Sequence, residues 1–490
     1  MYTLKTGSIF ILTTIALTSC VDAEFSEQVL YNKISDLGMN ANPIYNRELP
    51  SITDSKAQLG MKLFYTKGLG GDQDSACVTC HHPMLGGGDN LSLSIGAEAV
   101  SPDLLGPGRT HLSSGTNFDG GPTVPRNAPT TFNIGLWDEV LFHDGRVESL
   151  DKTPNVNGAG NIRTPDSVDI NTADGSAGPN LAAAQSRFPV TSPEEMRGHT
   201  YAPGSNAVLR AALEDRLNGV SSSPADVLPT NAWQAEFDSV YGASTTISYD
   251  LIADAIGEYE RSQVFVNSPW KAYVQGNAKA ISTQAKQGAL LFFNNINEGG
   301  ADCASCHTGD FFTDEGFHVI AMPQVGRGKG DGPDGSDDFG RFRETGLERD
   351  RYAFRTPSLL NVEVYGPWGH AGGYTSLEAV VRHHYNPQTA IDNFDFNQLE
   401  SSVQVTNMLK NTQLAINRLR ENQQANTIAP VLHDRTLDES EIAQIVSFLK
   451  TLTDPCVKSR ACLAPWIPDA SDTDPDSLRL NAIDNNGASL

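Results

Sequence analysis

Two identical arrangements of cysteine and histidine carry the clearest chemistry in this sequence. They are Cys77-Val-Thr-Cys80-His81 and Cys303-Ala-Ser-Cys306-His307. Two thiols at this spacing can add to the vinyl groups of one porphyrin, and the histidine that follows can bind its iron. A thioredoxin-like redox pair and half of a zinc site are the alternatives, but neither explains a histidine directly after both pairs. The motifs therefore predict two covalently attached haem c groups, with His81 and His307 as iron ligands.

The other three cysteines indicate export. Cys20 follows Leu17-Thr-Ser, behind a short apolar stretch and Lys5, and this pattern is typical of a bacterial lipoprotein signal. An ordinary secretory signal with a stray cysteine is the alternative. We expect a signal peptide over 1–19, a lipid anchor at Cys20 and a tether over 20–48, which would hold the protein on the periplasmic side of a bacterial membrane. In an exported chain, Cys456 and Cys462 predict a disulfide.

Composition limits the possible classes of protein. The chain has 490 residues, of which 39% are hydrophobic and 19% charged, so wholesale disorder is excluded and several domains are possible. Beyond the N-terminus, no apolar run reaches the ~20 residues that a membrane-spanning helix needs. The net charge of −24 argues against a nucleic-acid partner. An acidic surface of this kind suits a basic or neutral protein partner, or contributes to solubility alone.

The two halves of the chain repeat several short patterns around the motifs. Gly60-Met-Lys-Leu-Phe64 precedes the first motif as Gly288-Ala-Leu-Leu-Phe292 precedes the second, 126–133 resembles 355–361, and His143-Asp-Gly145 precedes Leu150 as His370-Ala-Gly372 precedes Leu377. Repetition on this scale predicts two related domains. Helical periodicity covers 251–262, 376–384 and 437–452, and alternating strand patterns are few. We therefore expect a mainly α fold of two cytochrome c-like domains, each with one haem.

The expected boundaries follow from changes in composition. The N-terminal domain covers 49–265 and the C-terminal domain 266–455. Within the first, 151–190 is rich in Asn, Gly, Ala, Asp and Pro, which predicts a surface insertion. We expect 456–490 to form a disulfide-closed acidic tail and 326–340 a loop. A calcium site in either acidic segment is the alternative to a solvated loop, although neither has an EF-hand spacing.

Taken together, the motifs and their surroundings resemble the bacterial di-haem cytochrome c peroxidase and MauG-like family. The resemblance runs from about 52 to 453, and its carriers are Cys77–His81 with 85–89, Arg126-Asn-Ala-Pro-Thr, Phe142-His-Asp-Gly-Arg146, Pro193-Glu-Glu-Met196, Phe311-Phe-Thr-Asp314 with Phe317-His318, and Arg355-Thr-Pro357. It implies a peroxidatic haem in the N-terminal domain and an electron-transfer haem in the C-terminal domain.

At the first haem, the resemblance assigns two positions. Many peroxidases of this family carry a histidine after a Ser-Ile-Gly segment, and this histidine blocks the iron until the other haem is reduced; here that position is Ala97. The resemblance therefore implies an open iron, unless His111 replaces the blocking histidine. The family's acid–base carboxylate precedes a methionine, which makes Glu195 the expected catalytic residue. A helix N-terminal charge is the alternative role for Glu195.

At the second haem, the family's distal ligand lies on the helix after Ser-Leu-Glu. The register from His370 places His384 at that position, so we expect His307 and His384 as the two axial ligands. Tyr385 is the second candidate. The alternative is that both His383 and His384 are surface residues on an amphipathic helix.

Two further features are implied by the resemblance. His143 occupies the position where many family members place a tryptophan between the haems, and we expect it to take part in the reaction. A structural calcium ion near the domain interface is implied, with the Asn127 side chain and the backbone oxygens of Tyr365 and Pro367 as ligands. Asn127 could equally be a turn residue.

Three functions remain open. The first is hydrogen peroxide reduction at the N-terminal haem, with electrons drawn through the C-terminal haem from a small redox protein such as a cytochrome c or a cupredoxin. The second is MauG-like oxidation of aromatic side chains on a specific partner protein. The third is a lipid-tethered electron carrier without catalysis. The carboxylate at Glu195 counts against the third function, since a carrier needs no acid–base group.

Overall fold

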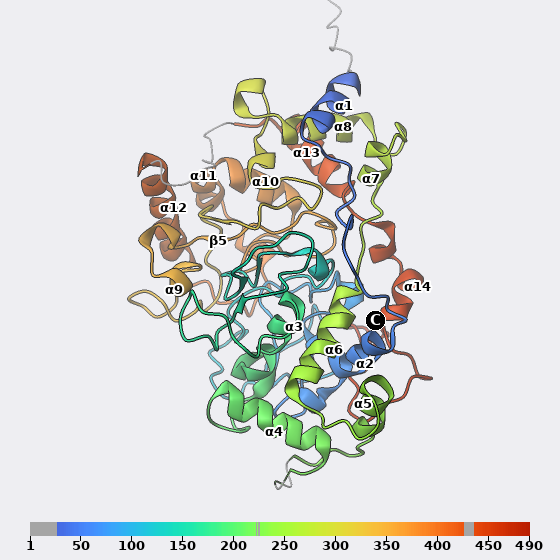
Figure 1. Ribbon diagram of the computed structural model, residues 1–490. Helices are drawn as coiled ribbons and strands as arrows, with labels where there is room; N and C mark the ends of the chain where they lie inside the picture. The colour runs from blue at the N-terminus through green and yellow to red at the C-terminus, as the bar shows by residue number, and fades with distance from the viewer. Residues whose placement is uncertain (1–26, 222, 224–225, 426–435) are drawn as a thin grey trace, which may run out of the picture.

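The computed structural model describes residues 27–221, 223, 226–425 and 436–490, and helices dominate it (Figure 1). The helices are α1 (Glu27–Asp36), α2 (Ser55–Tyr65), α3 (Leu181–Ser186), α4 (Asn206–Asn218), α5 (Trp233–Tyr241), α6 (Tyr249–Arg261), α7 (Pro269–Val274), α8 (Thr283–Phe293), α9 (Phe342–Thr345), α10 (Leu377–Tyr385), α11 (Pro387–Asp392), α12 (Met408–Ala425), α13 (Glu439–Lys450) and α14 (Arg460–Leu463). The strands are β1 (Val140–Leu141), β2 (Val147–Ser149), β3 (Ile162–Arg163), β4 (Phe317–His318) and β5 (Phe354–Arg355). The mainly α prediction is confirmed.

In the lower half of Figure 1, α2 crosses α6 at a very short distance. A Cβ atom on Gly60 of α2 would lie 1.9 Å from the backbone oxygen of Ala255 in α6, so only glycine allows this approach. The side chain of Ser248 accepts a hydrogen bond from the Leu251 amide and caps the start of α6. The two helices bury Leu63, Phe64 and Ile256 in the core of this half.

The upper half repeats the arrangement with α8 and α13. A Cβ atom on Gly288 of α8 would lie 1.9 Å from the backbone oxygen of Gln444 in α13. A capping box between Asp438 and Glu441 starts α13. The expected apolar face of this helix, at Ile442, Ile445, Val446 and Leu449, is buried in the core of this half. Each motif is therefore preceded by a helix that is fixed to a later helix through a glycine.

The N-terminal segment differs from the expected tether. From Glu27 onward the chain folds, because Leu30 and Ile34 of α1 are buried in the core of the upper half. The Tyr31 and Tyr273 rings stack with centroids 5.1 Å apart, and the Asp310 carboxylate accepts a hydrogen bond of 2.7 Å from the Ala41 amide. The expected signal peptide and the anchor at Cys20 lie outside the described residues.

The segment 151–190 is only partly the expected surface insertion. Strand β3 pairs with β2 in an antiparallel sheet, and Leu181, Ala182 and Ala184 of α3 are fully buried. Helix α3 packs on α6 where Gly257 lies close to the backbone of Ala183. Its run of small residues, which suggested a loop, serves this close packing.

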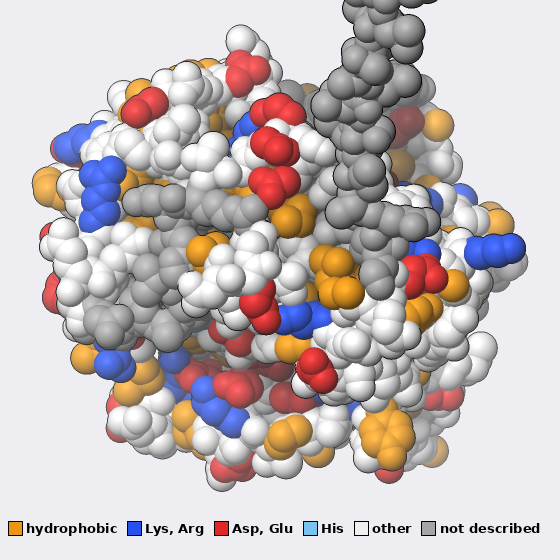
Figure 2. Space-filling view, turned by 90° about the horizontal axis from the view of Figure 1, so that it is seen from above, with side chains coloured by type: hydrophobic (Ala, Val, Ile, Leu, Met, Phe, Trp, Pro, Cys, Tyr) orange, Lys and Arg blue, Asp and Glu red, His pale blue; other side chains and the backbone are white. Residues whose placement is uncertain are grey.

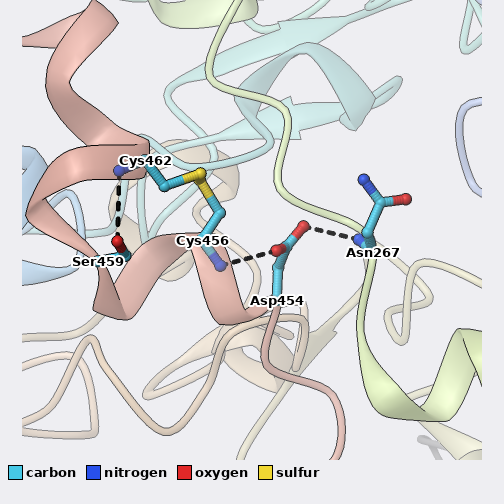
Figure 3. The surroundings of a disulfide bond; sticks show 5 residues. All are labelled: Asn267, Asp454, Cys456, Ser459 and Cys462. Carbon is cyan, nitrogen blue, oxygen red and sulfur yellow. Dashed lines mark hydrogen bonds between the residues drawn. A yellow bond between two sulfur atoms is a disulfide. The ribbon is translucent and has the colours of Figure 1, made fainter.

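The C-terminal segment also packs instead of forming a free tail. Cys456 and Cys462 form the expected disulfide, next to Asp454, which accepts hydrogen bonds from the amides of Cys456 and Asn267 (Figure 3). Farther along, the Asp476 carboxylate accepts hydrogen bonds from Thr66 and Trp233 of the lower half, at 2.6 and 2.9 Å. Leu463, Ile467 and Leu480 are buried in the core of that half.

No described helix is long and apolar enough to cross a membrane.

The glycine contacts generate a stability prediction. We expect Gly288→Ala to lower the free energy of unfolding by about 3 kcal/mol, because the new methyl group must push α8 away from α13. Gly175→Ala is the control, since a Cβ atom there meets nothing within 4 Å and should change stability by less than about 0.5 kcal/mol. Urea unfolding of both variants measures the difference, and equal effects would contradict the role of the close approach.

Candidate active site

The first motif lies in a short 3₁₀ turn over Cys77–Thr79, after α2. Cys77, Cys80 and His81 line one cavity, here called the first cavity. Both cysteines are free thiols, and the Nδ1 atom of His81 is 3.1 Å from the Gly87 carbonyl oxygen. A carbonyl can only accept, so Nδ1 carries the hydrogen and Nε2 keeps its lone pair. Burial lowers the pKa of His81 and favours this neutral, ligand-ready form.

Glu195 lies in the wall of the first cavity, on a π-helical turn over Pro193–Arg197. The side chains of Arg146 and Lys329 line the same cavity. Burial raises the pKa of the Glu195 carboxyl, while the positive charges of Arg146 and Lys329 oppose this rise. The structure thus brings together a carboxyl group, two cations and the first motif.

The Ser-Ile-Gly-Ala segment packs on the turn that carries Glu195. A Cβ atom on Gly96 would lie 2.2 Å from the Glu195 carbonyl oxygen, and the Ala97 amide donates a hydrogen bond of 3.2 Å to the Glu194 carbonyl oxygen. His111 does not line the first cavity: its ring stacks on Phe118 with centroids 5.4 Å apart. His111 therefore does not occupy the expected blocking position.

The second motif faces a larger cavity, here called the second cavity, which Cys303, Cys306, His307 and His384 line together. The His307 and His384 rings have centroids 6.5 Å apart. Each Nδ1 atom points to a backbone carbonyl oxygen, at 3.1 Å to Pro357 for His307 and at 2.8 Å to Val380 for His384. Both Nε2 lone pairs are thus left for another partner. Since a bond between a metal and a histidine nitrogen is about 2 Å long, the gap between the rings fits one metal ion.

The neighbours of His384 are engaged elsewhere. The Tyr385 hydroxyl donates a hydrogen bond of 2.6 Å to the Ala301 carbonyl oxygen. The His383 ring is fully buried, 2.8 Å from the Tyr374 hydroxyl and 2.9 Å from the Ile320 carbonyl oxygen. The alternative in which both histidines are surface residues is therefore wrong.

His143 lines both cavities and lies between the two motifs. Its Nε2 atom is 3.0 Å from the Asn127 carbonyl oxygen and therefore carries the ring hydrogen. Burial, together with the charge of Arg126, lowers the pKa of His143 to about 3. The ring is thus held neutral, as a hydrogen-bond donor to the backbone.

A buried ion network lies behind His143. The Arg126 guanidinium contacts the carboxylates of Asp144 and Asp338 at 2.5 and 2.6 Å. Burial alone would raise the pKa values of both carboxyls, but Arg126 outweighs it and holds them well below their usual range.

Asp338 belongs to 326–340, expected only as a loop, and Lys329 of the same loop reaches the first cavity. Sequence reasoning missed both residues, although Lys329 is one of only two cations in this acidic loop.

The residues expected at the calcium site line the second cavity together. These are Asn127, Tyr365 and Pro367. The Asn127 amide group donates a hydrogen bond of 2.9 Å to the Leu91 carbonyl oxygen.

Within the described part of the chain, three acidic, cysteine or histidine side chains meet at metal-binding distance in one place, formed by Cys306, Asp314 and His318. Cys306 belongs to the second motif, so this group is part of that site.

Comparisons with known proteins agree with this arrangement. A profile of the family described as di-haem cytochrome c peroxidase matches residues 54–279. The methylamine utilization protein MauG of Methylorubrum extorquens is 27% identical over 336 residues, which cover 68% of this chain and 69% of the relative. The cytochrome c551 peroxidase of Pseudomonas aeruginosa is 24% identical over 334 residues, which cover 67% and 71%. The chain is thus similar to di-haem cytochrome c peroxidases and to MauG, as the resemblance in the sequence indicated.

Two solved structures share the fold of this chain. A MauG-like protein associated with microbial copper homeostasis superimposes with a TM-score of 0.54 at 20% identity and covers 88% of this chain and 97% of its own. The di-haem peroxidase BthA from Burkholderia thailandensis gives 0.52 at 19% identity and covers 86% and 89%. The likeness to named cytochrome c peroxidases supports oxidoreductase activity, which confirms the expected class of enzyme.

The ion network generates a prediction for pH and stability. Because the pKa of Asp338 is depressed in the folded state, its pairing with Arg126 stabilises the fold above the ordinary carboxyl pKa of about 4 and loses this effect as the pH falls. We expect Asp338→Asn to cost about 3–5 kcal/mol at pH 7, and less at pH 3.

Asp334→Asn serves as the control in the same loop, because Asp334 pairs with Lys410 at the surface and should contribute less than about 1 kcal/mol. Urea unfolding at the two pH values measures both variants. A loss for Asp338→Asn that does not change with pH would contradict the role of ionised Asp338.

Proposed function

We propose that the two motifs each attach one haem c and that the chain reduces hydrogen peroxide in the first cavity, with electrons supplied through the second. The observation that carries this proposal is the placement of Glu195, with Arg146 and Lys329, in the cavity that Cys77, Cys80 and His81 also line. A pure electron carrier has no use for a carboxyl group with a raised pKa beside its haem. The two domains would be 49–265 and 266–455, with the first haem peroxidatic and the second transferring electrons.

The fit of the residues supports the cofactor. Covalent haem attachment requires two free thiols, a neutral imidazole with an available Nε2, and a cavity that all of them line. The first motif meets these requirements. Bound haem would supply an iron that exchanges electrons and binds peroxide. The hydrogen bond from His81 to the Gly87 carbonyl would orient the ring and raise its basicity as a ligand.

Glu195 would move the proton within bound peroxide. A carboxylate can take the proton from one peroxide oxygen and return it to the other, which prepares the bond between the oxygens for cleavage. Burial raises the pKa of Glu195 above its ordinary value, and the positive charges of Arg146 and Lys329 oppose this rise. The same group can therefore act first as a base and then as an acid. Ala97, in the position of the family's blocking histidine, would leave the iron open without prior reduction.

In the second cavity, we assign His307 and His384 as the two axial ligands. The ring centroids are 6.5 Å apart and each Nδ1 atom is hydrogen-bonded to a carbonyl oxygen, which supports His384. The Tyr385 hydroxyl instead donates a hydrogen bond to the Ala301 carbonyl oxygen. An imidazole in place of a thioether lowers the potential of a haem, so this haem would be a poorer electron acceptor than one with a methionine ligand. His143, neutral and lining both cavities, would lie on the electron path between the haems.

A second candidate function is MauG-like oxidation of aromatic side chains on a partner protein. The imidazole at position 384 and the open position at Ala97 favour it, because both suit a pair of haems that stores oxidising equivalents. Steady turnover with peroxide and a small redox donor, a cytochrome c or a cupredoxin, would support the first function. Turnover only with one specific protein would support the second.

The setting of the enzyme is also a proposal. We place it on the periplasmic side of a bacterial membrane, anchored through lipid at Cys20. The acidic side chains gathered near the centre of the face in Figure 2, and the net charge of −24, suit a basic or neutral protein partner rather than nucleic acid. A calcium ion bound by Asn127 and by the backbone oxygens of Tyr365 and Pro367 would stabilise the junction of the two halves.

Electron paramagnetic resonance of the oxidised, as-isolated protein tests the haem assignments. We expect one high-spin ferric signal, from the open first haem, and one low-spin signal, from the second. His384→Ala should convert the low-spin signal to high-spin, because one axial ligand is lost, while Tyr385→Phe should keep it. Two low-spin signals in the wild type, or loss of the low-spin signal in Tyr385→Phe, would contradict the assignments.

Peroxide turnover tests the acid–base role. We expect Glu195→Gln to lower the rate by about 100-fold or more, because an amide cannot take up the peroxide proton, with unchanged haem content and absorption spectrum. The matched control is Glu194→Gln, one residue away on the same turn, which should stay within a few-fold of the wild type. Equal activity of both variants would exclude Glu195 as the acid–base group.

A further inference from the structure

Glu260 is a buried carboxyl group that the proposed reaction does not use. It lies near the end of α6 with only 4% of its surface exposed. Its Oε2 atom has no hydrogen-bond partner, and no cation pairs with it among the residues that the structure describes. An unpaired charge in such a place is strongly unfavourable, so the group requires an explanation.

The cations on neighbouring elements are all engaged elsewhere. Lys56 and Lys62 of α2 pair with Asp254 and Glu236, and Arg187, which follows α3, pairs with Asp250. The adjacent Tyr259 hydroxyl donates to the Trp466 carbonyl oxygen. Burial alone therefore controls the carboxyl group, and it raises the pKa of Glu260 to about 8.

Glu260 lines the first cavity and the second cavity at once. The other titratable side chains in the wall of the first cavity are Cys77, Cys80, His81, Arg126, His143, Arg146, Glu195 and Lys329. Arg126 is paired with Asp144 and Asp338. Both cysteines would be bonded to haem, and His143 is held neutral. The positive charges of Arg146 and Lys329 oppose the rise in the pKa of Glu195, whereas burial is the one cause of the raised pKa of Glu260. Glu260 is thus the carboxyl group of this cavity that no cation compensates.

We propose that Glu260 binds one proton when the haem of the first cavity is reduced and releases it when that haem is oxidised. The inference rests on the proposed haem there. Oxidised iron carries one more positive charge than reduced iron, and at low dielectric this charge favours the carboxylate over the acid. One electron enters the iron and one proton from water enters the carboxylate, so the charge inside the cavity is balanced. By linkage, ionised Glu260 must in turn favour the oxidised haem.

This coupling suits peroxide reduction, which consumes two electrons and two protons for each peroxide converted into two water molecules. A carboxyl group that gains its proton together with an electron would hold that proton inside the cavity. Glu260 would then complement Glu195, which moves the proton that peroxide itself carries.

Potentiometric titration of the haem-loaded full chain, followed by absorbance from pH 6.5 to 9.5, tests the inference. We expect the midpoint potential of the first haem to fall as the pH rises, by up to about 59 mV per tenfold change in proton concentration, the limit for one proton per electron. In Glu260→Gln the potential should no longer depend on pH across this range. Glu258→Gln is the matched control on the same helix, where Glu258 pairs with Arg261, and it should keep the dependence.

Three results would overturn the inference. They are a potential in the wild type that does not change with pH, a dependence that persists in Glu260→Gln, and a dependence that Glu195→Gln alone removes. If Glu260→Gln does not load haem, Glu260→Met provides a second neutral side chain of similar length. A chain that carries no haem at all would refute the proposed function itself, which separates the two failures.

Discussion

The whole arrangement depends on two close crossings of helices. In each half, the helix before the Cys-x-x-Cys-His motif touches the backbone of a later helix at a glycine: Gly60 of α2 lies against α6, and Gly288 of α8 lies against α13. Backbone contact at this distance leaves little freedom for the helices to slide, since any shift would bring side chains into the gap. The turn that carries each motif is thus fixed relative to a helix about 140 to 180 residues away in sequence. Each cavity is built on this contact.

Local chemistry decided which parts of the site could be predicted from sequence. The two motifs, the disulfide and the helices with strong apolar periodicity were predictable because residue type and spacing alone determine them. The facing rings of His307 and His384 were predictable through the family resemblance, which assigns the distal ligand to the helix after Ser376-Leu-Glu. Glu260 and Lys329 were not, because their significance comes from what surrounds them. A glutamate on an amphipathic helix and a lysine in an acidic loop look solvated until the fold buries them.

Three segments pack more closely than the sequence indicated. The tether at 20–48 was expected from the signal that precedes it, and the insertion at 151–190 and the tail at 456–490 from their polar, small or acidic residues. In the structure, a few apolar side chains in each segment, such as Leu30, Leu181 and Leu480, are enough to bury it. Their hydrogen bonds go to distant elements, as from Thr66 and Trp233 to Asp476. Composition averaged over thirty or forty residues does not detect such sparse contacts.

Each end of the chain completes the core of the half that lies farther from it in sequence. Helix α1, at the beginning, completes the core around α8 and α13, while 456–490, at the end, completes the core around α2 and α6. Cutting the chain at the linker near α7 would therefore remove part of the core from both products. The folding of the two halves is therefore coupled, although each half has its own core. Because each core includes a segment from the opposite end of the chain, the two Cys-x-x-Cys-His motifs are held within one folded unit.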